Sequence, residues 1–369
     1  MAARPTTRHP AASIATRQAV PAAPRVRDFS GQATGYAIVW DVRSVYDFLF
    51  SLNEDDEFPH DLLDEDRAWR DAARADLLAA MPDDAPLISS EIAIMVAAVA
   101  VEHPEVTTVE AFLDVFESTP TPALLSLIMC ELVRDADIGA TVSRAIEGDR
   151  EARVALDELL PEHKIGFRAI LDDPEVTHER LTRILRAWAA HFARIEPRIR
   201  AVIERDHGLR AADRGAYAGS ELIERTTGGI RWLPEVGIRR VVLAPTYFSR
   251  PYNILLAGED WRFFGYPVAD DALDADDRLA PPAAVVRLHR ALGDETRLRI
   301  LKLLAGQDLY LTEIAQQLDL SKPTIKHHLA QLRSAGLVTV VEAGTVIYYS
   351  LRRDRIEAAS RELSGFLVP

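Results

Sequence analysis

Apolar positions follow a helical period through most of the first 225 residues of the chain. Such a period, with apolar residues every three or four positions, predicts amphipathic helices. Pro197 lies inside the last helical stretch and should kink or break it, because proline removes a backbone donor. The predicted helices lie near residues 45–52, 60–81, 88–102, 108–117, 122–134, 137–159, 165–172 and 178–206.

The pattern changes after Thr227, where β-branched and aromatic residues become frequent. Short runs of this kind, separated by turn residues, are typical of strands. They lie at Ile238–Leu243, Tyr252–Leu256 and Trp261–Tyr266. We predict a small antiparallel sheet packed on the helices, and the run at 35–40 is a candidate to join it.

Eight of the 26 aromatic residues fall between Trp232 and Tyr266. Aromatic side chains usually fill a core, but they also line pockets for apolar or aromatic ligands. Both interpretations fit this run. The residues that would line such an effector pocket are Trp232, Tyr247, Phe248, Tyr252, Trp261 and Phe263.

The last quarter of the chain predicts three helices in close succession. Leu298, Leu301 and Leu304 recur at helical spacing after Asp294, which can cap the helix start. A short helix follows from Leu311. The third helix would run from Lys322 to Ser334, because Ser321 is a good N-cap, Pro323 fits the first turn and Gly336 ends it.

The helix from Lys322 to Ser334 has an apolar face formed by Ile325, Leu329 and Leu332. At about 100° per residue, Thr324, His327 and Gln331 lie on the opposite face. Cations flank that face. This arrangement suits a DNA recognition helix, which needs a seated side, short polar groups for base edges and cations for phosphates. Two β-rich runs, Leu337–Val341 and Val346–Leu351, follow around a Gly-containing turn and predict a hairpin, or wing.

This quarter of the chain closely resembles the ArsR/SmtB family of bacterial repressors, and the rest of the chain would be a large N-terminal extension. The resemblance lies in an Arg-Leu-Arg-Ile-Leu helix, a Leu-x-x-Ala-x-x-Leu-x-Leu-Ser turn, a Thr-x-x-His-His-Leu-x-x-Leu helix, Gly-Leu-Val and a wing ending Tyr-Tyr-x-Leu. The residues that match are Arg297, Ile300, Leu301, Ile314, Ala315, Leu318, Leu320, Ser321, Thr324, His327, His328, Leu329, Leu332, Gly336, Leu337, Tyr348, Tyr349 and Leu351.

The resemblance implies a winged helix-turn-helix domain that binds a double-stranded DNA operator as a homodimer. Thr324, His327 and Gln331 would read bases. The other predicted DNA contacts, mainly to phosphates, are Thr312, Ser321, Lys322, Lys326, Arg333, Arg352 and Arg353. The wing tip, Glu342-Ala-Gly-Thr345, lacks the Arg or Lys that many family members carry there.

The family dimerises through the first and last helices of this domain, here residues 283–292 and 353–367. The last helix carries an apolar stripe of Ile356, Ala359, Leu363 and Phe366. This stripe could instead pack on the N-terminal region. Family metal sensors place Cys before the turn, or Asp and His along the last helix. The last helix here has no His or Cys, so we predict no metal site.

Charge divides the chain as the motifs do. The net charge is −14, but residues 282–369 hold 12 Lys and Arg against 9 Asp and Glu, which leaves 31 against 48 for the rest. The acidic part should therefore face away from DNA. We predict an α+β protein. It would have a basic disordered tail (1–29), a mainly helical N-terminal effector or interaction domain (30–269), a linker (270–281) and the DNA-binding domain (282–369).

Three other classes of protein, namely redox sensors, membrane proteins and enzymes, lack support in the sequence. The single cysteine, Cys130, lies in an apolar run and is expected to be a buried, inert thiol. The longest apolar stretch is too short for a membrane span. Common nucleotide-binding, hydrolase and metalloprotease motifs are missing, so we predict neither catalysis nor a cofactor.

The sequence thus predicts a cytoplasmic, nucleoid-associated repressor whose N-terminal domain senses an unknown effector. The alternative is that this domain is a protein-interaction or assembly module with an acidic docking surface. An enzyme fused to a repressor is a third hypothesis, but no set of residues points to one.

Overall fold

The computed structural model describes residues 35–53, 60–133, 138–159, 165–273, 281–343 and 346–368. The described residues belong to one compact unit of the chain, Ala33–Pro369. The predicted basic tail and residues 274–280 of the predicted linker lie outside the described residues.

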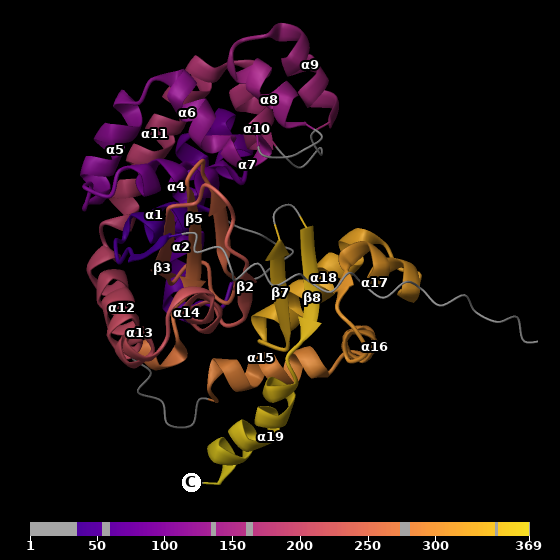
Figure 1. The fold of residues 1–369 in the computed structure, drawn as a ribbon. Helices are drawn as coiled ribbons and strands as arrows, with labels where there is room; N and C mark the ends of the chain where they lie inside the picture. Colours follow the sequence, from indigo (N-terminus) through magenta and orange to yellow (C-terminus); the bar gives the residue numbers. More distant parts are fainter. Residues whose placement is uncertain are drawn as a thin grey trace, which may run out of the picture. The chain divides into compact units, whose positions relative to one another are not determined.

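The N-terminal region is mainly helical, as predicted (Figure 1). Pro197 lies in the first turn of a new helix, so the predicted break is confirmed. Gly148, with φ of +94°, separates two helices where one was expected over 137–159. The helices are α1 (Val45–Leu52), α2 (Asp64–Ala80), α3 (Ala85–Ile88), α4 (Ile92–Glu102), α5 (Val109–Ser118), α6 (Thr121–Ile128), α7 (Cys130–Val133), α8 (Gly139–Ile146), α9 (Arg150–Leu159), α10 (Ile165–Asp172), α11 (Pro174–Phe192), α12 (Glu196–Leu209), α13 (Ala211–Ala216) and α14 (Gly219–Thr226).

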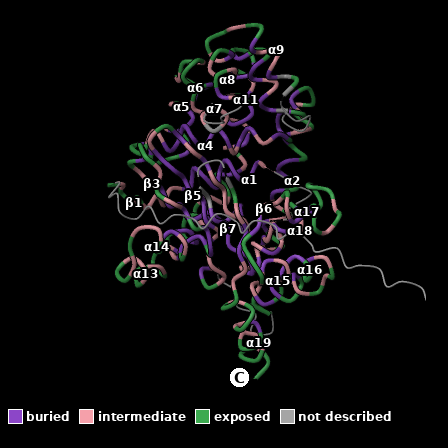
Figure 2. Tube along the Cα trace, turned by 45° about the vertical axis from the view of Figure 1, so that its right-hand side comes forward, coloured by how far each residue is buried: buried purple, intermediate pink, exposed green. Residues whose placement is uncertain are grey.

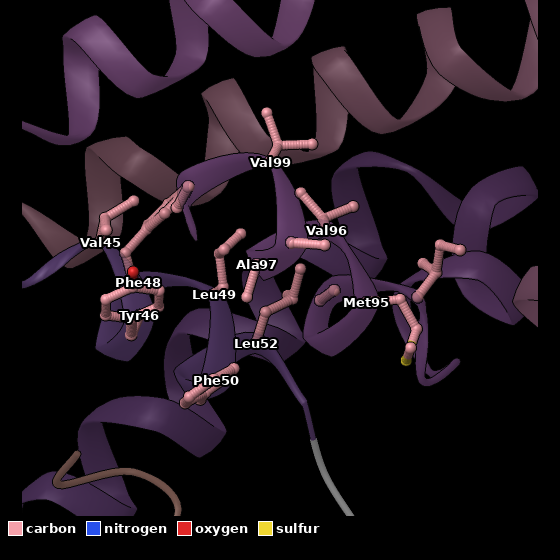
Figure 3. Close-up of a cluster of buried hydrophobic side chains, with 14 of the residues drawn as sticks. Val45, Tyr46, Phe48, Leu49, Phe50, Leu52, Met95, Val96, Ala97 and Val99 are labelled. Carbon is pink, nitrogen blue, oxygen red and sulfur yellow. The ribbon is translucent and has the colours of Figure 1, made fainter. Parts of the chain in front are cut away.

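Helices α1 and α4 form the centre of this region. All residues of α1 are buried, and α4 is apolar around its whole circumference, which is typical of a helix covered on every side. Figure 3 shows side chains of the two helices, including Phe48, Leu49 and Val96, in one buried cluster. Figure 2 shows the same concentration of buried positions around α1 and α4.

The predicted antiparallel sheet is a mixed sheet. It contains β1 (Ala37–Trp40), β3 (Arg240–Thr246), β5 (Trp261–Pro267) and β4 (Ile254–Ala257), in the order β1-β3-β5-β4. β1, β3 and β5 run parallel to one another, and β4 pairs antiparallel with β5. The antiparallel prediction is therefore wrong for most of the sheet. The prediction that the run at 35–40 joins it is confirmed.

The burial of β3 and β5 explains this difference. Each has six consecutive buried residues, so neighbouring elements cover both faces of the sheet. Strands covered on both faces are typical of parallel sheets, whereas an antiparallel sheet with one solvated face shows alternating polarity. The continuous apolar run Val241–Ala244 carried this signal.

The C-terminal region has the order expected of a winged helix-turn-helix. Its elements are α15 (Ala283–Leu292), α16 (Glu295–Leu304), β6 (Leu309–Tyr310), α17 (Leu311–Leu318), α18 (Lys322–Ser334), β7 (Val338–Ala343), β8 (Val346–Leu351) and α19 (Arg353–Leu367). Asp294 caps α16 by accepting a hydrogen bond from the backbone N–H of Arg297 at 2.9 Å. One leucine of the apolar repeat does not join the core. Leu298 is 48% exposed, because the buried face of α16 runs through Arg297, Ile300, Leu301 and Leu304.

A strand from the N-terminal region joins the sheet of the wing. β2 (Ile230–Trp232) pairs in parallel with β7, with Ile230 opposite Val340 and Trp232 opposite Glu342. The complete sheet has the order β2-β7-β8-β6. The two sheets and many helices fit the predicted α+β class, whereas the boundaries at residues 269 and 282 stay a prediction.

The described residues contain no single helix with both the length and the apolar composition needed to cross a membrane. One pair of segments, Pro82–Ile88 and Ile92–Glu102, meets both criteria together, with a bend of 68° between them.

Candidate nucleic-acid interface

Helices α17 and α18 are joined by a tight, well-capped turn. Asp319 adopts a left-handed conformation with φ of +55°, and the next N–H, of Leu320, bonds back to the carbonyl of Ala315 at 3.1 Å. Ser321 then caps α18, because its Oγ accepts the backbone N–H of Thr324 at 3.2 Å. These local interactions set where α18 starts.

Helix α18 has one face in the core and one in solvent. Ile325, Leu329 and Leu332 are completely or almost completely buried, as predicted. Lys322 and Thr324, near the helix start, are exposed, and so is Lys326. Thr312, at the start of α17, is exposed as well. The first half of α18 therefore presents two cations and a hydroxyl to solvent.

The second half of α18 is more enclosed. His327 and Gln331 are half-buried, and their Nε2 atoms lie 2.6 Å apart. The side-chain Oε1 of Gln331 accepts a hydrogen bond from Arg297 at 2.5 Å. Two of the predicted base-reading residues are thus in contact with each other, and one of them is held by the scaffold.

Arg297 is a structural residue whose role the sequence patterns did not reveal. It is 8% exposed, and its guanidinium also donates to the carbonyls of Ala291 at 2.7 Å and Arg290 at 2.8 Å. Those carbonyls lie in the last turn of α15, where carbonyls lack the usual helical partner, and that of Arg290 also accepts the N–H of Gly293 at 3.3 Å. Arg297 therefore links the end of α15 to α18. The available signals were its place in the Arg-Leu-Arg-Ile-Leu motif and its charge inside an apolar segment.

His328 lies beside the apolar face of α18. Its side chain is mostly covered, and burial lowers its pKa. Its Nδ1 has no hydrogen-bond partner among the described residues, and the nearest carboxylate oxygen, of Asp294, is 3.8 Å away. His328 is therefore not positioned as a ligand beside His327. Across the described part of the chain, no group of three or more His, Cys, Asp or Glu side chains could hold a metal ion.

The remaining predicted phosphate contacts interact with the protein itself. Arg352 donates to the carbonyl of Gly228 at 2.9 Å and to Asp354 at 3.0 Å. Arg353 donates to the carbonyl of Ala305 at 2.6 Å. Arg333 is half-buried. To contact DNA, Arg352 and Arg353 would have to exchange these partners.

The wing is anchored by its strands. β7 pairs antiparallel with β8 over six residue pairs, and Tyr349 is buried opposite Val340. At the tip, Gly344 and Thr345 lie outside the described residues, as do the side chains of Glu342 and Ala343. The predicted effect of the tip sequence therefore stays a prediction.

The aromatic residues predicted to line an effector pocket are mostly core residues. Tyr247, Phe248, Trp261 and Phe263 are fully buried in the central hydrophobic cluster. Trp232 is fully buried in a separate cluster beside β3 and β5. Tyr252 is half-buried and lines a cavity next to α15 and α18. Core packing therefore accounts for five of the six.

The thiol of Cys130 donates a hydrogen bond to the carbonyl of Ala257.

The capped turn, the half-exposed helix and the hairpin together define a winged helix-turn-helix. Residues 294–340 match the family model described as "Bacterial regulatory protein, arsR family". The chain is 36% identical to the transcriptional repressor SdpR of Bacillus subtilis over 80 residues, which are 22% of this chain and 89% of SdpR. The chain belongs to the arsR family of bacterial regulatory proteins and is a DNA-binding transcription regulator.

Two further relatives show the limits of the match. The regulator KmtR of Mycobacterium tuberculosis is 38% identical over 72 residues, which are 20% of this chain and 55% of KmtR. The transcriptional activator HlyU of Vibrio cholerae is 34% identical over 76 residues, which are 21% of this chain and 70% of HlyU. Each of these three matches covers about a fifth of this chain, so none of them accounts for the large helical region.

Proposed function

We propose that this regulator is a repressor that inserts the first half of α18 into the major groove of its operator. The observation that carries the proposal is the exposed set of Lys322, Thr324 and Lys326 on a helix whose other face is seated in the core. Thr324 and His327 would read base edges, and the two lysines, with Ser321 and Thr312, would bind phosphates. Gln331 would read a base only after leaving Arg297. Such a regulator acts on the bacterial nucleoid, in the cytoplasm.

The test separates phosphate contacts from base contacts. Binding of the full chain to its own upstream region is measured by fluorescence anisotropy across a range of salt concentrations. Lys326→Ala should weaken binding to all DNA similarly and lower the salt slope by about 1, whereas Thr324→Ala should relax the choice among operator variants. Lys302→Ala, an exposed lysine on α16, is the matched control. A sequence-selective effect of Lys326→Ala would contradict this placement of α18.

We further propose a homodimer formed through α15 and α19. The two helices pack on each other, and Ala359 of the predicted stripe is buried between them and the core. Ile356 is 39% exposed and Leu363 and Phe366 are half-buried, so part of the stripe remains available to a second copy. A two-fold dimer would bind two half-sites about one helical turn of DNA apart.

Sedimentation of paired variants tests the dimer. Ile356→Asp should shift the protein toward the monomer and weaken operator binding, because it places a charge in the apolar contact. Val236→Asp is the control, since Val236 is 88% exposed in the N-terminal region. If both variants sediment as the wild type does, the interface lies elsewhere.

The proposal also includes repression of transcription and the sensing of an effector by the N-terminal region. SdpR is named a repressor and HlyU an activator, so the direction of regulation is tested directly, by transcription in vitro from the bound promoter. Sensing by the N-terminal region is supported by β2, because a movement of that region would be passed to β7 of the wing. A stoichiometric protein partner with no stabilising ligand would contradict sensing of a small molecule.

A further inference from the structure

A cavity of about 280 Å³ lies between the N-terminal region, α15 and α18. One wall comes from residues near the start of α2 and from the loop before β4. The other comes from the end of α15 and the second half of α18. The residues that line it are His60, Asp61, Arg67, Pro251, Tyr252, Arg287, Arg290, Ala291, Gln331 and Ser334.

The walls of this cavity carry an excess of positive charge. Arg67, Arg287 and Arg290 face a single carboxylate, Asp61, which is already paired with Arg287. Among the described residues, Arg67 donates to the carbonyls of His60 at 3.4 Å and Leu62 at 3.2 Å and to no carboxylate. Arg290 makes no side-chain ion pair or hydrogen bond within the described part of the chain. Within the part of the chain that the structure describes, these two guanidinium groups therefore have no carboxylate partner.

Two further atoms indicate that the cavity is built for polar contact. The Nε of Arg287 is buried and has no hydrogen-bond partner among the residues that the structure describes. The Nδ1 of His60 lies 3.1 Å from Arg70, so it accepts a hydrogen bond and the ring is neutral. Burial, with the nearby Arg70 and Arg67, lowers the pKa of His60 to about 4. The positive charge at neutral pH therefore comes from the arginines.

We propose that this cavity binds a small organic anion, a carboxylate or a phosphate ester, as the effector of this regulator. Arg67 and Arg290 would bind the anionic group, because a guanidinium fork matches the geometry of carboxylate and phosphate oxygens. Pro251, Tyr252 and Ala291 would contact the apolar part of the molecule. Only the role of the anion as an effector rests on the proposed function, because the binding itself needs no DNA.

Gln331 connects the cavity to the DNA-binding helix. It lines the cavity, accepts a hydrogen bond from Arg297 and contacts His327. An anion that draws the Gln331 amide into the cavity would break one of these contacts and change the exposed side of α18. An effector works only by binding two states with different affinities, and this contact provides such a difference.

The binding test uses the full chain and two probes, benzoate and inorganic phosphate, in calorimetry and thermal unfolding. We expect one probe to bind with a Kd of about 1 mM or below and to raise the unfolding temperature. Arg290→Ala should weaken that binding by about tenfold, and Arg67→Ala should do the same. Arg299→Ala, an exposed arginine on α16, is the control and should bind as the wild type does.

The two probes distinguish a carboxylate site from a phosphate site. Failure of both to bind overturns the proposal, and so does equal loss of binding in Arg299→Ala, which would indicate general charge attraction. Ser334→Ala provides a second variant on the cavity wall that keeps the charge, and it should leave the affinity for the anion within about twofold.

A DNA titration separates this inference from the proposed function. Arg290→Ala should bind operator with the wild-type salt slope but should no longer respond to the anion. A reduced salt slope in this variant would instead make Arg290 a contact to DNA phosphates and overturn the anion site. Anion binding without any operator binding would leave the cavity assignment standing and contradict the proposed function.

Discussion

The buried guanidinium of Arg297 and the side-chain amide of Gln331 form a hydrogen bond between α16 and α18. The same guanidinium binds two carbonyls at the end of α15, so three helices of the winged domain meet at one charged group. Because one wall of the cationic cavity includes Gln331, this hydrogen bond lies between the N-terminal region and the DNA-binding face.

Arg297→Ala should lower the free energy of unfolding by about 2–4 kcal/mol, because it removes three hydrogen bonds made by one buried guanidinium. Arg297→Lys should recover only part of this loss, since an ammonium cannot reproduce the guanidinium fork. Urea unfolding of the purified variants measures both changes. Arg299→Ala, exposed on the same helix, is the control and should change stability by no more than about 0.5 kcal/mol.

Gly229 precedes β2 and should tolerate no side chain. Its φ is +129°, and a Cβ there would lie 3.3 Å from Oγ1 of the buried Thr339 on β7. Gly229→Ala should therefore lower stability by about 1–3 kcal/mol and weaken the β2–β7 pairing. Thermal unfolding measures the loss. In Gly208→Ala, at the end of α12, the new Cβ meets no atom within 4 Å, so this control should be neutral or slightly stabilising. Equal destabilisation by both would argue against the β2–β7 contact.

Alanine substitutions at two leucines of α16 should have very different effects on stability, although the leucines are three residues apart. Leu301→Ala should cost about 2–4 kcal/mol, because Leu301 is 6% exposed in the domain core. Leu298→Ala should change stability by about 0.5 kcal/mol or less, because about half of Leu298 is exposed and it lies outside the buried face of α16. Chemical denaturation of the two variants measures the difference. Similar losses would mean that the face of α16 is rotated from the position described.

Local patterns predicted the winged domain well because its helix caps and turns are local. Ser321 and Asp294 each cap a backbone N–H three residues further along the chain, so capping rules found them. The buried positions of α18 follow the helical period, so periodicity found those. The same rules did not separate Leu298 from the buried Leu301 and Leu304, because periodicity alone does not show which of two adjacent stripes faces inward.

The sheets were less predictable because their pairing is not local. Ala37 pairs with Arg240, and Ile230 pairs with Val340, across long stretches of chain. No short-range pattern shows that a strand before the linker will join the wing. The cationic cavity was unpredictable for the same reason, since Arg67 and Arg290 are far apart in the sequence and come together only in the folded chain. Sequence reasoning therefore found the residues exposed on α18 but not those that connect α18 to the N-terminal region.

Asp47 should make stability depend on pH. It is fully buried in α1, and its Oδ1 accepts the backbone N–H groups of Tyr247 and Phe248, both at 2.8 Å. Its Oδ2 has no partner among the described residues. Burial raises the pKa of Asp47 from an ordinary value of 3.8 to about 7, although the two backbone hydrogen bonds oppose this. Between about pH 4 and 7, the Asp47 carboxyl is therefore protonated in the folded state and ionised in the unfolded state.

A raised carboxyl pKa means that the contribution of Asp47 to stability falls as the pH rises through that range and is constant above it. Asp47→Asn cannot ionise and keeps an acceptor for the two N–H groups. The stability of this variant relative to the wild type should therefore increase by about 2–3 kcal/mol between pH 5 and pH 8. Urea unfolding of both proteins at several pH values measures this difference, which cancels the titration of all other groups. A difference that stays flat, or that decreases with pH, would show that Asp47 is ionised in the folded protein throughout the range.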